Sequence, residues 1–107
     1  MNLTKDLFTK TIHEAEKPVL VEYQAPWCVY CKRLESVMQA VEKQYADTLT
    51  IGFVNIDDEP ALEEQENIEL IPTLALYRDG KRLGTIVNPD SKAKIDTFIR
   101  ETLNNKE

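Results

Sequence analysis

Residues 19–32 read VLVEYQAPWCVYCK. The first five of these residues carry hydrophobic side chains at both odd and even positions, which is typical of a central strand covered on both faces. Two cysteines, Cys28 and Cys31, follow after a proline, and the hydrophobic spacing beyond them is helical. The stretch therefore predicts a buried strand that leads through a short loop into a helix beginning near the cysteine pair.

The flanking sequence predicts three further helices and three further strands. The first helix is expected to begin after Thr4, its N-cap, and to end near Glu16. The other predicted elements are a strand at residues 50–56, a short helix capped by Asp58 and ending near Asn67, strands at residues 73–78 and 81–87, and a last helix capped within residues 88–91. Helices between strands imply parallel pairing, and the Asp79-Gly80 turn adds an antiparallel hairpin. We expect an α/β fold in one domain, residues 1–107, with a mixed sheet and helices on both faces.

Composition excludes several classes of function. The chain has 107 residues, 42% hydrophobic residues and a formal net charge of -6. Such a charge would be repelled by nucleic-acid phosphates and by an anionic membrane surface. The N-terminal residues do not look like a secretory signal, and no apolar run approaches the roughly 20 residues that cross a bilayer. We therefore expect a cytoplasmic protein.

The chain has only two cysteines, three positions apart. In a reducing cytosol a structural bridge across so short a loop gains little stability, so redox or metal chemistry is the better explanation. A zinc site normally requires four Cys or His ligands, and only His13 is left to contribute. We expect His13 on the surface and no metal bound, although a cluster shared by two subunits stays open until the purified protein is analysed for zinc and iron.

The position of the cysteines at a helix start suits thiol–disulfide exchange. Exchange needs a thiolate to attack and a second thiol to resolve the mixed disulfide. A free thiol has a pKa of about 8.5, and the unpaired N–H groups at the start of a helix stabilise its ionised form. We therefore expect Cys28 to be the exposed nucleophile and Cys31, one turn further along, to be the buried resolving thiol.

With these residues in place, the run at residues 19–32 resembles the active-site segment of thioredoxins. Residues 54–57, 71–74 and 77–81 look like the next three landmarks of that family, in its order and at its usual spacing. The match extends from about Leu3 to the C-terminus. The resemblance implies the thioredoxin fold, here with an N-terminal strand that is short or missing.

Several positions depart from the usual thioredoxin pattern. Between the cysteines, Val29-Tyr30 replaces Gly-Pro. The other departures are Glu22 where Asp is usual, Gln24 where Trp is frequent, Phe53 where Lys is frequent, Ser36 in place of a helix proline, and Asn88-Pro89 in place of a Gly-containing pair. These changes concern substrate choice and reduction potential more than the chemistry itself.

The resemblance implies that Glu22 is a buried acid behind Cys31, which accepts and returns the Cys31 proton through water. Because Phe53 stands where a lysine is frequent, we expect Glu22 to be desolvated without a nearby cation, with its pKa raised. The alternative is that Glu22 points to solvent at a strand end, which avoids the cost of burying a carboxylate.

The segment Ile71-Pro72 resembles the cis-proline element of the family. A cis bond here implies that the Ile71 backbone faces the cysteines and pairs with an extended substrate. Trp27, Val29 and Tyr30 would then complete an apolar substrate-contact surface around the nucleophile with Ile71 and Pro72. The alternative for Trp27 and Tyr30 is plain core packing.

The resemblance implies a protein-disulfide reductase that binds no cofactor, works as a monomer and is recycled by an NADPH-dependent thioredoxin reductase. A Cys-x-Tyr-Cys motif also suggests glutaredoxins, but a Gly-Gly glutathione motif is missing after Pro72. The alternative from another class is a partner-binding or redox-sensing module with little general reductase activity. Trapping mixed disulfides with Cys31→Ser separates these functions. Many trapped partners would favour a general reductase, whereas one dominant partner would favour the module.

Overall fold

Helices and strands alternate along residues 1–104, the part of the chain that the structure, a computed structural model, describes. The helices are α1 (Lys5–Glu14), α2 (Val29–Gln44), α3 (Pro60–Gln65) and α4 (Lys92–Asn104). The strands are β1 (Val19–Gln24), β2 (Thr50–Asn55), β3 (Thr73–Arg78) and β4 (Lys81–Val87). None of the helices in this part of the chain has the length and hydropathy needed to cross a membrane.

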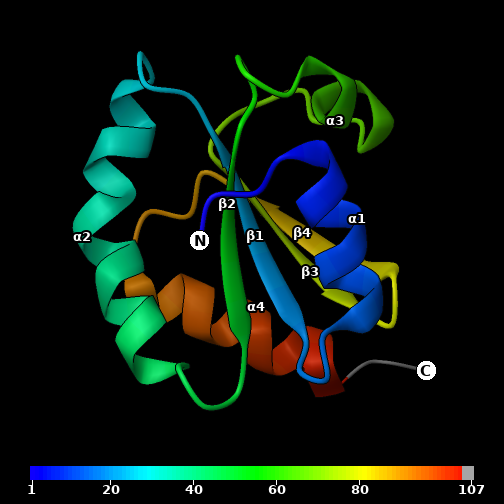
Figure 1. Cartoon of the computed structure of the whole chain (residues 1–107). Coiled ribbons are helices and arrows are strands. Elements are labelled where there is room, and N and C mark those ends of the chain that lie inside the picture. Colours follow the sequence, from blue (N-terminus) through cyan, green and yellow to red (C-terminus); the bar gives the residue numbers. More distant parts are fainter. Residues whose placement is uncertain (105–107) are drawn as a thin grey trace.

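The strands form one mixed sheet in the order β2-β1-β3-β4. Strand β1 is parallel to β2 and antiparallel to β3, and β4 pairs antiparallel with β3. Helices cover both faces, with α1 on one side and α2 on the other (Figure 1). The α/β fold class with a mixed sheet is confirmed. The expected short N-terminal strand is reduced to one bridge between Asn2 and Phe53.

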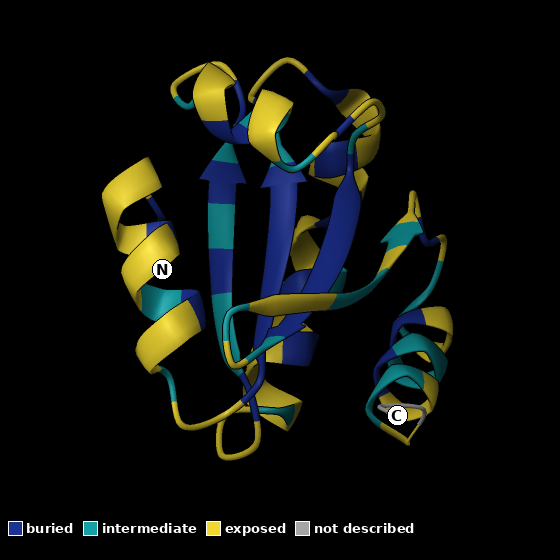
Figure 2. Cartoon of the chain, turned by 90° about the vertical axis from the view of Figure 1, so that its right-hand side faces the viewer, coloured by how far each residue is buried: buried dark blue, intermediate teal, exposed yellow. Residues whose placement is uncertain are grey.

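Each face of the sheet has its own hydrophobic core, and β1 contributes to both because its side chains alternate between the faces. Val19, Val21 and Tyr23 pack with Phe8 of α1 in the first core, which also holds both cysteines. The second core holds Leu20 together with residues of α2, β3 and α4, namely Leu34, Met38, Val41, Leu74, Leu76, Ile95 and Ile99. The central strands β1 and β3 are almost wholly buried and dark blue in Figure 2, whereas the outer faces of the helices are exposed. This arrangement fixes the end of β1 and the start of α2, where the cysteines lie.

Most element boundaries agree with the sequence expectations, and the exceptions have local causes. Helix α1 ends at Glu14, two residues earlier than expected, and the Thr4 side chain accepts a hydrogen bond from the Leu7 N–H at 3.3 Å. The expectation that Asp58 caps α3 is wrong. Glu59 occupies the cap position without a side-chain cap bond, and Pro60 begins the helix.

The Asp79-Gly80 turn joins β3 to β4 and packs against the end of α1. Gly80 has φ +80°, a conformation that side chains disfavour, and its N–H donates to the Ile12 carbonyl at 2.8 Å. A Cβ atom placed on Gly80 would overlap the His13 imidazole. The exposed His13 therefore borders this turn, and the turn requires glycine.

Gly80→Ala is expected to lower the free energy of unfolding by about 1–2 kcal/mol, because alanine is strained at positive φ and must displace His13. Urea unfolding measures the change. Gly84→Ala in β4 is the matched control, because its Cβ would meet only ordinary contacts, the nearest being Thr102 Cγ2 at 3.4 Å. Equal destabilisation by the two substitutions would contradict this account of the turn.

Candidate active site

The cysteine pair lies where β1 leads into α2. Cys28 is the N-cap residue of α2, and the Cys31 N–H donates a hydrogen bond to Cys28 Sγ at 3.1 Å. The Cys28 carbonyl accepts from the Lys32 N–H at 3.1 Å, which is the first bond of the helix. Both thiols are free. Cys28 Sγ thus takes the place of a cap oxygen, and the helix start favours negative charge on it.

The expectation that Cys28 is exposed is wrong. Only 5% of Cys28 is exposed, compared with 3% of Cys31, so both residues are buried. Cys28 Sγ lies 3.9 Å from the Ile71 carbonyl oxygen, in the loop before β3. This loop therefore folds over the start of α2 and covers the Cys28 thiol.

The Ile71–Pro72 peptide bond is cis, as the resemblance implies. Pro72 is buried and Ile71 is half-buried. The Pro72 carbonyl accepts a hydrogen bond from the Asn88 N–H at 2.7 Å, which ties this loop to the end of β4. Asn88 has φ 48°, and asparagine tolerates this left-handed conformation better than most residues.

Exposed apolar side chains flank the cysteines. Trp27, Val29 and Tyr30 are 64%, 59% and 54% exposed, which excludes plain core packing for Trp27 and Tyr30. The Trp27 indole N–H donates to Asp57 Oδ2 at 2.9 Å, and the Arg33 guanidinium lies 5.4 Å from the centre of the Tyr30 ring. These contacts hold the two aromatic rings in place at the surface.

Two further exposed apolar residues, Leu70 and Val87, were not singled out from the sequence. Leu70 directly precedes Ile71 and is 64% exposed. Val87 pairs with Thr73, the residue after Pro72, at the end of β4. Each of them stands two positions before a proline, Pro72 or Pro89, but hydrophobic spacing cannot tell an exposed loop residue from a buried one.

Glu22 is buried under α2, and its burial was expected. It is 2% exposed, and its cross-strand neighbours are Phe53 on β2 and Leu74 on β3. Its Oε2 atom has no hydrogen-bond partner among the described residues. Desolvation, followed by the negative charge of Glu35, raises the pKa of Glu22 from 4.5 to about 7. At neutral pH this carboxyl can therefore both accept and return a proton.

Burial, and then the hydrogen bond with Cys28, raises the pKa of the Cys31 thiol to about 12. The charges of Cys28 and Glu22 act in the same direction. The thiol therefore keeps its proton at neutral pH until a base removes it. Any change that removes the hydrogen bond and the charge of Cys28 therefore lowers the pKa of Cys31.

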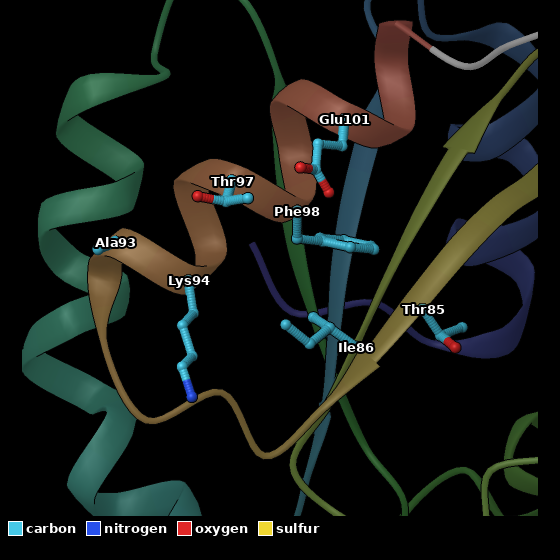
Figure 3. Close-up of a pocket in the computed structure, with 7 residues that line it drawn as sticks. All are labelled: Thr85, Ile86, Ala93, Lys94, Thr97, Phe98 and Glu101. Carbon is cyan, nitrogen blue, oxygen red and sulfur yellow. The ribbon is translucent and has the colours of Figure 1, made fainter.

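Two cavities connect this region to the surface. One has a volume of about 140 Å³ and is lined by Cys31, Gln24 and Glu35 among others. The second, of about 220 Å³, is lined by Glu22, again with Gln24 and Glu35. A larger cavity of about 450 Å³ lies between β4 and α4, where Ile86 and Phe98 face each other (Figure 3). No cysteine is among the described residues that line this larger cavity, so its size does not mark the reactive site.

The site combines a thiol at the helix cap, a second thiol one helical turn away, and a buried carboxyl with a raised pKa. Together these groups define a site for thiol–disulfide exchange. The comparisons with known proteins agree. The sequence model of the thioredoxin family, described as Thioredoxin, matches residues 1–101. This chain belongs to the thioredoxin family.

Curated relatives cover nearly the whole chain. Thioredoxin 1 of Synechococcus elongatus is 34% identical over 101 residues, 94% of each chain. A thioredoxin of Acidithiobacillus ferridurans is 36% identical over 101 residues, again 94% of each chain. A thioredoxin of Buchnera aphidicola is 33% identical over 99 residues, 92% of this chain and 91% of the relative. Thioredoxins are protein-disulfide oxidoreductases that need no cofactor beyond their cysteine pair, and this chain is a thiol–disulfide oxidoreductase. The alternative of a module that only binds or senses is not favoured.

Proposed function

We propose that this protein reduces protein disulfides, with Cys28 as the nucleophile and Cys31 as the resolving thiol. The hydrogen bond of 3.1 Å from the Cys31 N–H to Cys28 Sγ carries the proposal, because it stabilises negative charge on one sulfur only. Cys28 attacks a substrate disulfide, one substrate sulfur leaves as a thiolate and takes up a proton, and a mixed disulfide forms. Cys31 then attacks Cys28 Sγ, the second substrate thiol leaves, and the Cys28–Cys31 disulfide forms. The two cysteines lose two electrons, which the substrate disulfide gains.

Glu22 acts as the base of the second step in this proposal. The Cys31 proton moves through water to the Glu22 carboxylate, and the reverse transfer accompanies re-reduction. A pKa of about 7 for Glu22 supports both directions at neutral pH. The Oε2 atom supports the same role, because it has no hydrogen-bond partner in residues 1–104 and can take up a proton.

Substrate contacts are assigned to the surface around Cys28. The exposed Trp27, Val29 and Tyr30 supply apolar area, and the backbone of Ile71 pairs with an extended substrate segment beside Pro72. The exposure of the first three residues supports this assignment, because apolar side chains beside a nucleophile gain stability when a substrate covers them.

The substrates of this family are protein disulfides. We assign the recycling of the oxidised form to an NADPH-dependent thioredoxin reductase, and we propose a monomer with one domain, no bound cofactor and a cytoplasmic location. The cysteine content supports a reducing compartment, because the chain has only two cysteines and structural disulfides are rare there.

Insulin reduction tests the proposed direction. The reduced protein is expected to cleave insulin disulfides, and catalytic amounts should turn over with NADPH and a thioredoxin reductase, followed as NADPH oxidation. Reduction by glutathione alone, without any turnover with the reductase, would contradict the assignment of the recycling partner.

A further inference from the structure

The cavity beside Cys31 and the cavity beside Glu22 share two lining residues, Gln24 and Glu35. Glu35 lies one helical turn after Cys31 on α2, and its side chain is exposed. Both cavities are polar and larger than the roughly 15 Å³ that one water needs. Glu35 therefore borders the cavity at Cys31 and the cavity at Glu22.

Few ionisable groups line this route. Helix α2 brings Cys31, Lys32, Glu35 and Glu42, and β1 brings Glu22. Strand β2 adds only Phe53 and Asn55, and the N-terminal segment adds only Asn2. Among these described groups, Glu35 is the one ionisable residue that lines both cavities. Gln24, the other shared residue, cannot ionise.

We propose that Glu35 is a positioning residue that passes protons between Cys31, Glu22 and bulk water. The inference rests on the proposed function, because it assigns a route to the proton that Cys31 releases. Its second contribution is electrostatic, since a carboxylate close to Glu22 favours the protonated form of that buried side chain. Lys32 lines the Cys31 cavity but not the Glu22 cavity, so its positive charge does not offset the effect of Glu35 on Glu22.

The proposed step is balanced. In the mixed disulfide, the Cys31 S–H gives its proton through water in the first cavity to Glu35, which passes a proton through water in the second cavity to the Glu22 carboxylate. The Cys31 sulfur bonds to Cys28 Sγ as the bond from Cys28 to the substrate sulfur breaks. The substrate leaves as a thiolate and takes a proton from water. Glu22 later returns its proton to bulk water past Glu35, so both glutamates end in their starting state.

Glu35→Gln keeps the size of the side chain but removes its ability to ionise. We expect the titration midpoint of the Glu22 carboxyl to fall by about half a pH unit, because a nearby negative charge is removed. Carbon NMR of that carboxyl group measures the midpoint. We also expect Cys31 to resolve the mixed disulfide about threefold more slowly at about pH 8, where Glu22 is ionised with or without the substitution. This rate of attack by Cys31 on the mixed disulfide is the resolution rate. Added imidazole buffer should restore the rate, since a small base replaces a proton carrier but repairs no misfolded helix.

Glu42→Gln is the matched control. It removes the same charge from the same helix and the same Glu22 cavity, but Glu42 does not line the Cys31 cavity. The control should leave the resolution rate and its buffer dependence unchanged. A Glu22 midpoint that stays near its original value in Glu35→Gln, or a rate equal to that of Glu42→Gln, would overturn the inference. The proposed function fails on a different result, which is full insulin turnover by Cys28→Ser.

Discussion

Cys28→Ser is expected to lower the rate of insulin reduction by about a thousandfold or more, because a serine hydroxyl cannot replace a thiolate in disulfide exchange. Cys31→Ser is expected to lose catalytic turnover as well, but for a different reason. It still forms the mixed disulfide and cannot resolve it. The measurement is the rate of insulin reduction with NADPH and a thioredoxin reductase.

Ser36→Ala, at an exposed position on the same helix, is the control for these substitutions. It should keep the rate of the original protein, and thermal unfolding should show that all three variants are folded. Turnover by Cys28→Ser at the rate of the control would remove the cysteine pair from the reaction.

Glu22→Gln is expected to change how stability depends on pH. Burial raises the pKa of Glu22 in the folded state from 4.5 to about 7. Between these two values the unfolded chain ionises at this position while the folded chain stays protonated, so unfolding gains a favourable step as pH rises. The stability from the neutral carboxyl is complete below a pH of 4.5 and is lost as pH rises to about 7. The loss amounts to about 3 kcal/mol at about 1.4 kcal/mol per pH unit.

Urea unfolding at about pH 4 and about pH 8 measures this effect. The original protein should lose about 3 kcal/mol more than Glu22→Gln between the two conditions, because glutamine does not ionise. Glu42→Gln, an exposed change of the same chemistry, should follow the original protein. The same dependence on pH in Glu22→Gln as in the original protein would contradict the burial of an ionisable Glu22. The same substitution should also slow disulfide exchange at neutral pH.

Much of the fold could be predicted because local signals agreed with long-range packing. The apolar run of β1 appears at both even and odd positions because both faces of that strand are covered. Strands β3 and β4 lie within the expected residues, since the Asp79-Gly80 turn fixes where the hairpin reverses. The cap of α3 was missed because Asp58 and Glu59 both precede Pro60, and composition alone does not choose between them.

The residues of the candidate active site also differ in how far the sequence predicts their positions. The positions of Cys28 at the cap and Cys31 in the first turn of α2 follow from local spacing. The burial of Glu22 was implied by the resemblance, since an apolar strand alone left a solvent-facing position open. The covering of Cys28 depends on a loop more than 40 residues away, as the contact between Cys28 Sγ and the Ile71 carbonyl oxygen demonstrates. The hydrophobic spacing of α2 predicts Glu35 on its water-facing side, and the residue is exposed. Its place between two cavities is a property of packing that hydrophobic periodicity does not contain.

Mapping the sulfur that joins a trapped substrate tests the central claim most directly. Cys31→Ser and Cys28→Ser, each incubated with a disulfide-bonded peptide, are digested without reduction and analysed by mass spectrometry. The account predicts that Cys31→Ser accumulates the peptide on Cys28, whereas Cys28→Ser accumulates little on Cys31, because burial, the largest cause of its raised pKa, remains. Equal trapping on Cys31 would show that the helix start does not select the attacking sulfur, and the roles given to both cysteines would be wrong.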